Sequence, residues 1–163
     1  MIFPVYTDKG GYRRFGTKRS GKLFEGDTYH LGYDFNVPKG TKVRSIMKGH
    51  VLFAGQMNGF GSLFPSTKGG CVIIRHEFND ETYYGIYGHL DDIQVRLGEY
   101  VLETDVLGKV NSFTSNGVVL THCHFGLFKC DKMPTNHLGY CKEIGNAIDP
   151  IKFIKDNEGM WLK

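Results

Sequence analysis

Two histidines lie two residues apart in the segment THCHFGLF, residues 121–128. The apolar and aromatic residues around them favour a β-strand, in which side chains at positions i and i+2 point to the same face. His122 and His124 would therefore face the same side, with Gly126 beyond them. A pair of imidazoles on one strand face is either a polar pair in contact with water or part of a metal site. The pair alone does not decide between these interpretations.

A third histidine and a carboxylate lie in the segment YHLGYDFN, residues 29–36. His30 and Asp34 are four residues apart, so they share a face of an extended strand and would also share a face of a helix. Gly32, the aromatic neighbours and Pro38 favour the strand. Together with the His-x-His pair, this segment supplies nitrogen and oxygen donors suited to zinc. Three protein ligands and an open fourth position make a catalytic zinc site, whereas four closed ligands make a structural one.

The segment YGHL, residues 87–90, ends a predicted strand with His89 at a turn. Taken alone, such a histidine is most often a surface or hydrogen-bonded side chain, and the same interpretation covers His50, His76 and His137. A single His-x-His pair is as often an ordinary polar strand face, and a single His-x-x-x-Asp is more often structural. The weight of a functional interpretation therefore rests on the combination of the three segments.

These side chains must be positioned by strands, because helical periodicity is scarce and the chain contains 22 glycines. Such a pattern is typical of many short strands joined by tight turns. Asp149 before Pro150 begins the one predicted helix, a short terminal one over residues 149–157. The predicted strands cover 29–37, 42–55 (two strands that turn near Lys48-Gly49), 70–78, 82–90 and 118–129, with a hairpin turn at 78–82 and alternation of apolar and polar residues over 96–110.

A weak internal repeat relates residues 37–51 to residues 95–110. Both segments contain a valine, a glycine turn, a second valine and a second glycine turn, which predicts two similar β-hairpin units folded against each other. We therefore expect a single all-β domain over residues 1–163, with a β-sandwich or barrel-like core and a long loop at 56–70. Lipoyl-type carrier modules and sugar phosphocarriers show similar patterns, so this fold class leaves the function open.

The composition excludes several classes of protein. The chain has 163 residues, enough for one domain with a real core. Its 20 basic and 17 acidic residues give a net charge of +3, too slight to indicate a nucleic-acid partner. The locally basic stretch over residues 9–22 is better explained as a solvated glycine-rich loop than as a contact with an anionic polymer. No apolar run approaches the roughly 18 residues of a membrane span.

The N-terminus and the cysteines carry two further expectations. The first residues lack the apolar core of a signal peptide, so the protein is either made without a leader or is a mature or trimmed form. The four cysteines do not follow a zinc-finger spacing. We expect them to be free thiols rather than disulfides, although Cys130 and Cys141 would close the shortest loop.

In this order, the three motifs His-x-Gly-x-Asp, Tyr-x-His-Leu and His-x-His-Phe resemble the zinc endopeptidase family of lysostaphin and LytM, whose members cut peptidoglycan cross-bridges. Residues 15–43, FGTKRSGKLFEGDTYHLGYDFNVPKGTKV, are similar to the opening segment of that family. The resemblance covers about residues 15–154. The other matching segments are GGCVIIRH, YGHL, VRLGEYV and THCHFGLF in the core and NAIDPIKFI at the end.

The resemblance implies a role for each of five residues. His30, Asp34 and His124 would bind one zinc ion per chain in a groove, and His89 and His122 would line the cleft beside the metal without binding it. All five are present, whereas degenerate members of the family have lost ligands and act only as activators. Two features depart from the family pattern: a cysteine fills the middle of His-x-His, and the 56–70 loop looks longer than usual and could narrow or extend the groove.

The implied chemistry is hydrolysis by activated water. Zinc lowers the pKa of bound water from ~15.7 toward ~7 and polarises the scissile carbonyl. His89 and His122, with ordinary pKa values near ~6.5, could hold or pass on the proton and stabilise the oxyanion. The sequence has no His-Glu-x-x-His motif, so the glutamate base of that class of metalloprotease is absent and histidines would take its place.

The sequence therefore predicts a monomeric zinc endopeptidase that hydrolyses cross-bridges or stem peptides of bacterial peptidoglycan, in the periplasm or outside the cell. One alternative is a β carrier domain, which would leave Asp34 and the His-x-His pair without a role. Another is a non-catalytic wall-binding or activating module of the same family, which predicts lost ligands. The bond cut, a glycine bridge or a D-alanyl link to a diamino acid, stays open, as does a phage or bacterial origin.

Overall fold

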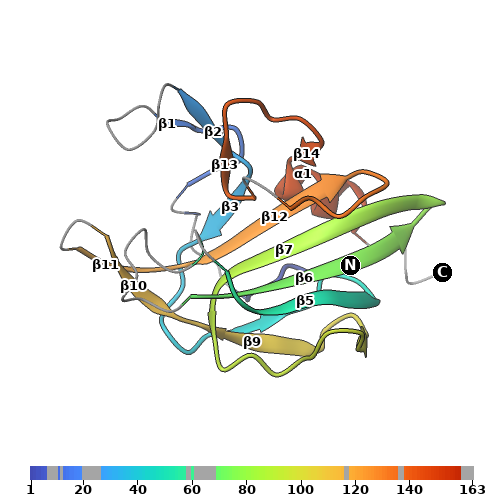
Figure 1. The fold of residues 1–163 in the computed structure, drawn as a ribbon, viewed down its shortest axis with the longest axis horizontal. Coiled ribbons are helices and arrows are strands. Elements are labelled where there is room, and N and C mark those ends of the chain that lie inside the picture. The colour runs from blue at the N-terminus through green and yellow to red at the C-terminus, as the bar shows by residue number, and fades with distance from the viewer. Residues whose placement is uncertain are drawn as a thin grey trace.

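The computed structural model describes residues 1–6, 11, 13–19, 27–57, 60, 69–115, 118–135 and 138–158. These residues form antiparallel strands and one short helix near the C-terminus, so the predicted all-β class is confirmed (Figure 1). The described part of the chain contains no helix with the length and apolar character of a membrane span. The elements are β1 (Lys18–Arg19), β2 (Thr28–His30), β3 (Gly32–Phe35), β4 (Lys42–Arg44), β5 (Gly49–Gln56), β6 (Gly70–Phe78), β7 (Glu81–Asp91), β8 (Tyr100–Val101), β9 (Val106–Val110), β10 (Ser112–Ser115), β11 (Val118–Thr121), β12 (Cys123–Lys129), β13 (Tyr140–Cys141), β14 (Ala147–Ile148) and α1 (Pro150–Asp156).

One large antiparallel sheet carries most of the fold. Its main path runs β14-β12-β7-β6-β5-β8. β3 pairs with the same edge of β12 as β14 does, and β9 pairs with both β4 and β7. Figure 1 shows β12, β7, β6 and β5 side by side, with the small β1-β2-β13 sheet above β3 and β12. β10 and β11 form a separate hairpin directly before β12. The strand β12 therefore lies at the junction of the large sheet, the small sheet and the hairpin.

The two similar segments at 37–51 and 95–110 lie against each other, as the repeat predicts. Strand β4 of the first segment pairs with β9 of the second, and β5 pairs with β8. The hydrogen bonds thus join the two segments to one another. The second segment also reaches β7, because β9 pairs with Leu90 and Asp91 at the end of that strand.

Local sequence signals explain the turn between β6 and β7 and the start of the helix. Asn79 and Asp80 have φ angles of 50° and 60°, and positive φ at both central residues is what a type I′ hairpin turn requires. The carboxylate of Asp149 accepts hydrogen bonds from the backbone N–H groups of Ile151 and Lys152, with Pro150 at the first helical turn. Both predictions, the hairpin at 78–82 and the helix near 149–157, are confirmed.

The large sheet is apolar on both faces, because one core cluster lies on each side. Along β6, Val72 and Ile74 belong to one cluster and Cys71 and Ile73 to the other, and all four side chains are buried. The four cysteines are free thiols, as predicted. The core therefore needs no cross-links.

His76 is buried in the core and takes part in a chain of hydrogen bonds. Its Nδ1 is 2.9 Å from the carbonyl oxygen of Lys48, and its Nε2 is 3.4 Å from the hydroxyl of Tyr87, which also accepts from the backbone N–H of Ile46. This is the hydrogen-bonded histidine that its isolated position in the sequence predicts. Burial lowers the pKa of His76 to about 4, so the folded protein holds the ring neutral.

We expect acid to destabilise the fold through His76. Between pH 6.5 and about 4 the unfolded chain binds a proton that the folded chain does not, so the free energy of unfolding must decrease as the pH falls. Between pH 7.5 and pH 4 the contribution of His76 to this decrease in the free energy of unfolding should approach about 3 kcal/mol. Urea unfolding of the metal-free protein at pH 7.5, 6 and 5 measures it.

The variant His76→Asn keeps a donor for the Lys48 carbonyl but does not titrate in this range. Its unfolding free energy should be lower than that of the wild type at pH 7.5 and should change less between pH 7.5 and pH 5. The exposed His50, on the neighbouring strand β5, provides the matched control for removing a histidine. An equally steep pH dependence in His76→Asn and in the wild type would contradict the assignment.

Candidate metal centre

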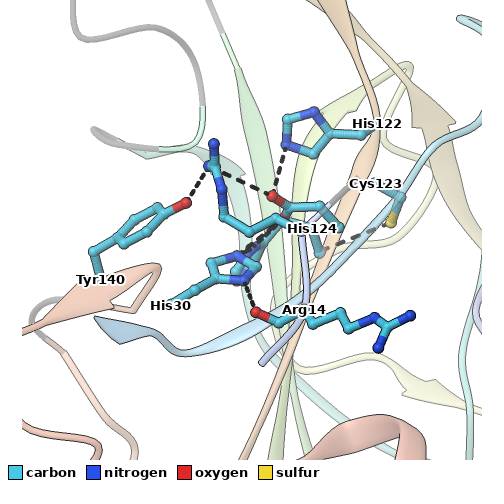
Figure 2. A network of polar contacts seen from close by, with 8 residues as sticks. Arg14, His30, His122, Cys123, His124 and Tyr140 are labelled. Carbon is cyan, nitrogen blue, oxygen red and sulfur yellow. Dashed lines mark hydrogen bonds and ion pairs between the residues drawn. The ribbon is translucent and has the colours of Figure 1, made fainter. Parts of the chain in front are cut away.

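Three strands bring together the donors that the sequence analysis singled out. Asp34 of β3 lies directly opposite His124 of β12 in the antiparallel register. His30 ends β2, and Leu31 carries the chain from the small sheet into the large one, with its backbone N–H bonded to the carbonyl of Gly139. The two sheets therefore meet at His30, Asp34 and His124 (Figure 2).

The three donor atoms form a nearly equilateral triangle. The Oδ1 atom of Asp34 is 3.1 Å from Nε2 of His30 and 3.0 Å from Nδ1 of His124, and the two nitrogens are 3.1 Å apart. Two ligand atoms at about 2.0–2.1 Å from one zinc ion, at a tetrahedral angle, would lie about 3.3 Å apart. The donor types and their separations therefore fit a zinc ion.

The outer contacts of His30 orient its ring for this role. Its Nδ1 lies 3.0 Å from the carbonyl oxygen of Arg14, which can only accept, so Nδ1 carries the proton. The lone pair of Nε2 then points toward Asp34 and His124. Metal-binding histidines commonly make such a hydrogen bond with their second nitrogen.

The electrostatics of the triangle suit a cation. Burial by itself would raise the pKa of Asp34, but hydrogen bonds with His124 and His30 outweigh it and hold the pKa of this carboxyl well below its usual range. Burial lowers the pKa of His124, despite the opposing effect of Asp34. An ionised carboxylate and a neutral imidazole are the forms that bind a metal.

His122 and His89 lie beside the triangle rather than in it. The Nε2 atom of His122 is 3.7 Å from Oδ2 of Asp34, the oxygen that does not face His30 and His124. The ring of His89 is 4.5 Å from that of His122 and 6.5 Å from that of His124, measured between centroids. Both side chains are buried. The structure thus brings all five predicted side chains into one cluster.

The protonation of the two outer histidines follows from their surroundings. Burial lowers the pKa of His122 to about 4. Burial, with smaller contributions from His122 and His124, holds the pKa of His89 well below its ordinary value. Both rings are therefore neutral at pH 7 and can accept a proton.

His89 occupies a β-bulge, which corrects its expected place in a turn after the strand. Gly88 pairs with Cys71 and Leu90 with Gly70, so His89 is an extra residue inside β7. Its φ angle is 61°, which is unusual for a residue other than glycine. Bulges re-aim side chains near functional sites, and backbone strain of this kind gathers there. The spacing in the sequence does not reveal a one-residue bulge.

Two glycines of the sequence motifs make room for the cluster. A Cβ atom on Gly32 would lie 2.6 Å from the carbonyl oxygen of Phe125 and 2.7 Å from Cε1 of His124. A Cβ atom on Gly88 would lie 2.1 Å from the ring of Phe60. Both distances are too short for any side chain. The glycine in His-x-Gly-x-Asp is therefore explained by the ring of His124 that packs on it.

We expect Gly32→Ala to weaken zinc binding. The methyl group would push the His124 ring or the β12 backbone away from Asp34, because it has no space at its present position. A loss of about 10–100-fold in zinc affinity is the size seen when groups that orient metal ligands are removed. Competition titration with a chelator measures it. Gly55→Ala is the matched control, since its Cβ atom would meet only Phe53, at 3.8 Å. Wild-type affinity in Gly32→Ala would refute the steric argument.

Phe60 is a site residue that the sequence analysis missed. Its ring lies 5.2 Å from that of His124 and 5.9 Å from that of His89, and only 4% of the residue is exposed. It comes from the predicted 56–70 loop, of which residues 58–59 and 61–68 lie outside the described part of the chain. The predicted effect of this loop on the groove falls on those residues and stays a prediction. A single aromatic residue in a glycine-rich loop carries no periodic signal.

Arg13 and Tyr140 also lie at the centre without having been predicted. The Nη1 atom of Arg13 donates to the hydroxyl of Tyr140 and lies 3.9 Å from Oδ2 of Asp34. Tyr140 pairs with His30 across β13 and β2. No motif in the sequence links position 13 to position 140. The fold brings them together, because the backbone of Arg13 is bridged to Asp34 and Tyr140 pairs with His30 in the small sheet.

The remaining candidates lie elsewhere. His50 is exposed and packs against Tyr100, and His137 is outside the described residues. Only part of the basic 9–22 stretch is described. Cys123 is buried in the core cluster that also holds Phe125 and Leu127, on the face of β12 away from the histidines.

Comparison with known proteins finds relatives of this chain. Among curated proteins, the chain is similar to DD-carboxypeptidase/endopeptidase Mpg of Neisseria meningitidis serogroup B, with 29% identity over 112 residues, which are 69% of this chain and 22% of that protein. An uncharacterised protein of Haemophilus influenzae is 25% identical over 122 residues, 75% of this chain and 26% of that protein. The chain thus spans about a quarter or less of the length of these relatives.

Solved structures show the same fold. LytU matches with a TM-score of 0.61 and 28% identity, over 93% of this chain and 88% of that one. Lysostaphin from Staphylococcus simulans matches with a TM-score of 0.65 and 24% identity, over 93% of this chain and 52% of that one. The model of peptidase family M23 matches residues 28–137, the segment that contains all five clustered side chains. A match over two thirds of the sequence shows that this chain belongs to peptidase family M23.

Proposed function

We propose that the chain is a zinc-dependent endopeptidase that hydrolyses peptide cross-bridges or stem peptides of bacterial peptidoglycan. The observation that carries this proposal is the convergence of His30, Asp34 and His124, with donor atoms 3.0–3.1 Å apart, in a member of peptidase family M23. An ion of zinc bound there would supply Lewis acidity and lower the pKa of bound water. His30, Asp34 and His124 would hold one ion per chain.

The other residues of the cluster would then serve the proton transfers. His122 and His89 are neutral at pH 7 and lie next to the ligands, so each can accept a proton from the attacking water and return it to the leaving amine. Of the two histidines, His122 is the one with a ring nitrogen close to a proposed ligand, because its Nε2 atom lies 3.7 Å from Oδ2 of Asp34. Phe60 covers the His89 and His124 rings and keeps bulk water away from them. These roles suit hydrolysis of an amide.

The names of the relatives support a cell-wall peptide as substrate. Mpg is called a DD-carboxypeptidase/endopeptidase, and lysostaphin an antimicrobial peptidase. Such a substrate would place the protein at the cell wall, in the periplasm or outside the cell. We also propose that the protein acts as a monomer. A β carrier domain or a non-catalytic module of the same family explains less, because neither uses the full set of five side chains.

Two measurements test the proposal together. Protein from zinc-replete growth should contain about one zinc ion per chain, or bind one on titration. Digestion of purified sacculi should release new amino groups, and mass analysis of the muropeptides identifies the bond. Absence of zinc binding would refute the enzymatic proposal. New reducing sugars without new amino groups would indicate a glycosidase, and equal activity on casein a general protease.

A further inference from the structure

A cationic cluster lies on the small sheet beside the metal centre. Tyr140 pairs with His30, and the two rings are 5.0 Å apart between centroids. The guanidinium carbons of Arg13 and Arg19 lie 5.7 Å and 5.5 Å from the centre of the Tyr140 ring. Arg13 also donates to the Tyr140 hydroxyl. Two arginines thus share one aromatic ring next to a proposed zinc ligand.

Arg13 is the member of this cluster that reaches the centre itself. Its backbone carbonyl accepts the N–H of Asp34, at 2.8 Å, which fixes the two residues side by side. Its Nη1 lies 3.9 Å from Oδ2 of Asp34, too far for a hydrogen bond. The side chain of Arg13 is 25% exposed and that of Asp34 only 3%. The guanidinium therefore lies between the buried centre and solvent, where a ligand can meet it.

Tyr140 of the cluster and His122 flank the centre. In Figure 2, Tyr140 and His122 are drawn on opposite sides of the contacts that join His30 to His124. Arg13 and His122 both approach Oδ2 of Asp34, at 3.9 Å and 3.7 Å, so an anion bound to Arg13 would lie close to the proposed site of proton transfer. A guanidinium carries five N–H donors in a rigid fork, so it can bond to Tyr140 and at the same time bind a carboxylate of a ligand.

The reach of a peptide decides which carboxylate would fit. A carboxylate on the carbon attached to the scissile nitrogen is three bonds from the scissile carbonyl carbon, or about 3–4 Å. That is comparable with the 3.9 Å between Arg13 and Asp34. A substrate carbonyl held beside Asp34 and His124 would thus place such a carboxylate within reach of Arg13. A peptide bond inside a glycine bridge has a neutral amide at that position instead.

We propose, on the basis of the proposed function, that Arg13, held in place by Tyr140, binds a free carboxylate on the residue that follows the scissile bond. The geometry then favours D-alanyl bonds to a terminal D-amino acid or to the carboxylate-bearing centre of a diamino acid. Bonds within glycine bridges lack this group. Arg13 is thus a residue that determines specificity and not one that makes or breaks a bond.

Paired substrates test this directly. A D-alanyl-D-alanine peptide with a free C-terminal carboxylate and the same peptide as its C-terminal amide differ only in the group that Arg13 would bind. The zinc-loaded wild type should prefer the acid by about 10–100-fold in kcat/KM, as expected for charge-assisted hydrogen bonds. Arg13→Gln should reduce this ratio toward one, and Arg13→Lys should restore only part of it. Arg75→Gln, which removes an exposed arginine paired with Glu77 on β6, should keep the wild-type ratio.

A binding measurement separates specificity from support of Asp34. Uncleavable analogues, in which a methylene group replaces the scissile carbonyl, can be titrated into the zinc-loaded protein and followed by NMR. The acid analogue should bind about 10-fold or more tighter than the amide in the wild type, and the two should bind alike in Arg13→Gln. Zinc content should be the same in both proteins.

Three outcomes would overturn the inference. In one, the wild type binds and cleaves the acid and the amide equally. In another, Arg13→Gln loses zinc together with activity on both peptides, which would make Arg13 a support for Asp34. In the third, the wild type cleaves glycine bridges in preference to D-alanyl bonds. In each of these cases the zinc peptidase itself stands, whereas a wild type that neither binds zinc nor cleaves any wall peptide refutes the proposed function.

Discussion

Replacing His124 by alanine is expected to remove bound zinc and peptidase activity together. The three proposed ligands contribute one donor atom each, so the variant would retain only two, and a catalytic zinc site needs three. The fall in zinc affinity should exceed the ~10–100-fold typical for loss of an outer-shell partner. Asp34→Ala should behave in the same way, because its Oδ1 atom contacts both histidines. Zinc content per chain and the hydrolysis rate, measured on the same preparation, test both variants.

The control for this experiment is a histidine outside the cluster. His50→Ala removes an exposed imidazole from β5 and should leave both zinc and activity at wild-type levels. His124 is fully buried, so the circular dichroism of each variant must be compared with that of the metal-free wild type. His124→Gln provides a less disruptive second variant. If His124→Ala keeps its zinc while His122→Ala arrives without it, the two histidines have exchanged the proposed roles.

The sequence predicted the long strands well because their apolar pattern is local. Residues 70–78 were predicted as a strand and are β6, and the 82–90 prediction differs from β7 by one residue at each end. The turn between them and the helix after Asp149 also depend on adjacent residues. Strands of two residues, such as β8, β13 and β14, were not predicted individually. Such strands exist only through their partners, which a local pattern does not contain.

The two motif segments were each predicted as one strand but contain two. Residues 29–37 divide at Leu31 into β2 and β3, and residues 118–129 divide at His122 into β11 and β12. In both cases the two parts belong to different sheets. A change of sheet partner does not alter the alternation of apolar and polar residues, so the sequence could not show where one strand ends and the next begins. The side chains still converge, because the breaks occur beside the functional residues and aim them at the same point.

The composition of the cluster was easier to predict than its shape. Histidines and an aspartate in a recognisable order indicated five side chains, which the structure places within one cluster. Phe60 and Arg13 were missed, since an aromatic residue or an arginine in a glycine-rich segment has many ordinary explanations. Only the fold brings them to the histidines. Of the two, Arg13 is the residue that the acid and amide substrates test.

His122→Ala and His89→Ala are expected to keep their zinc and to lose turnover by roughly 10²–10⁴-fold each, the range for removal of a general acid or base. Neither side chain belongs to the close triangle of donors, since the nearest approach of His122 to Asp34 is 3.7 Å. Loss of either ring should therefore leave the ligands in place while removing a proton acceptor. Zinc analysis and kcat on one defined muropeptide measure the two effects separately.

The double variant carries the stronger argument. The rings of His89 and His122 are 4.5 Å apart and would serve the same proton transfer, so removing both should reduce the rate by much less than the product of the single losses. His89 has a φ angle of 61°, a conformation that costs a residue with a side chain about 1–2 kcal/mol. Asparagine adopts it more readily than alanine, so His89→Asn must be measured beside His89→Ala. Equal rates in His89→Asn and His89→Ala would attribute the loss to the imidazole and not to the bulge. Losses that multiply in the double variant would instead mean that the two histidines act in separate steps, contrary to the single proton path proposed for them.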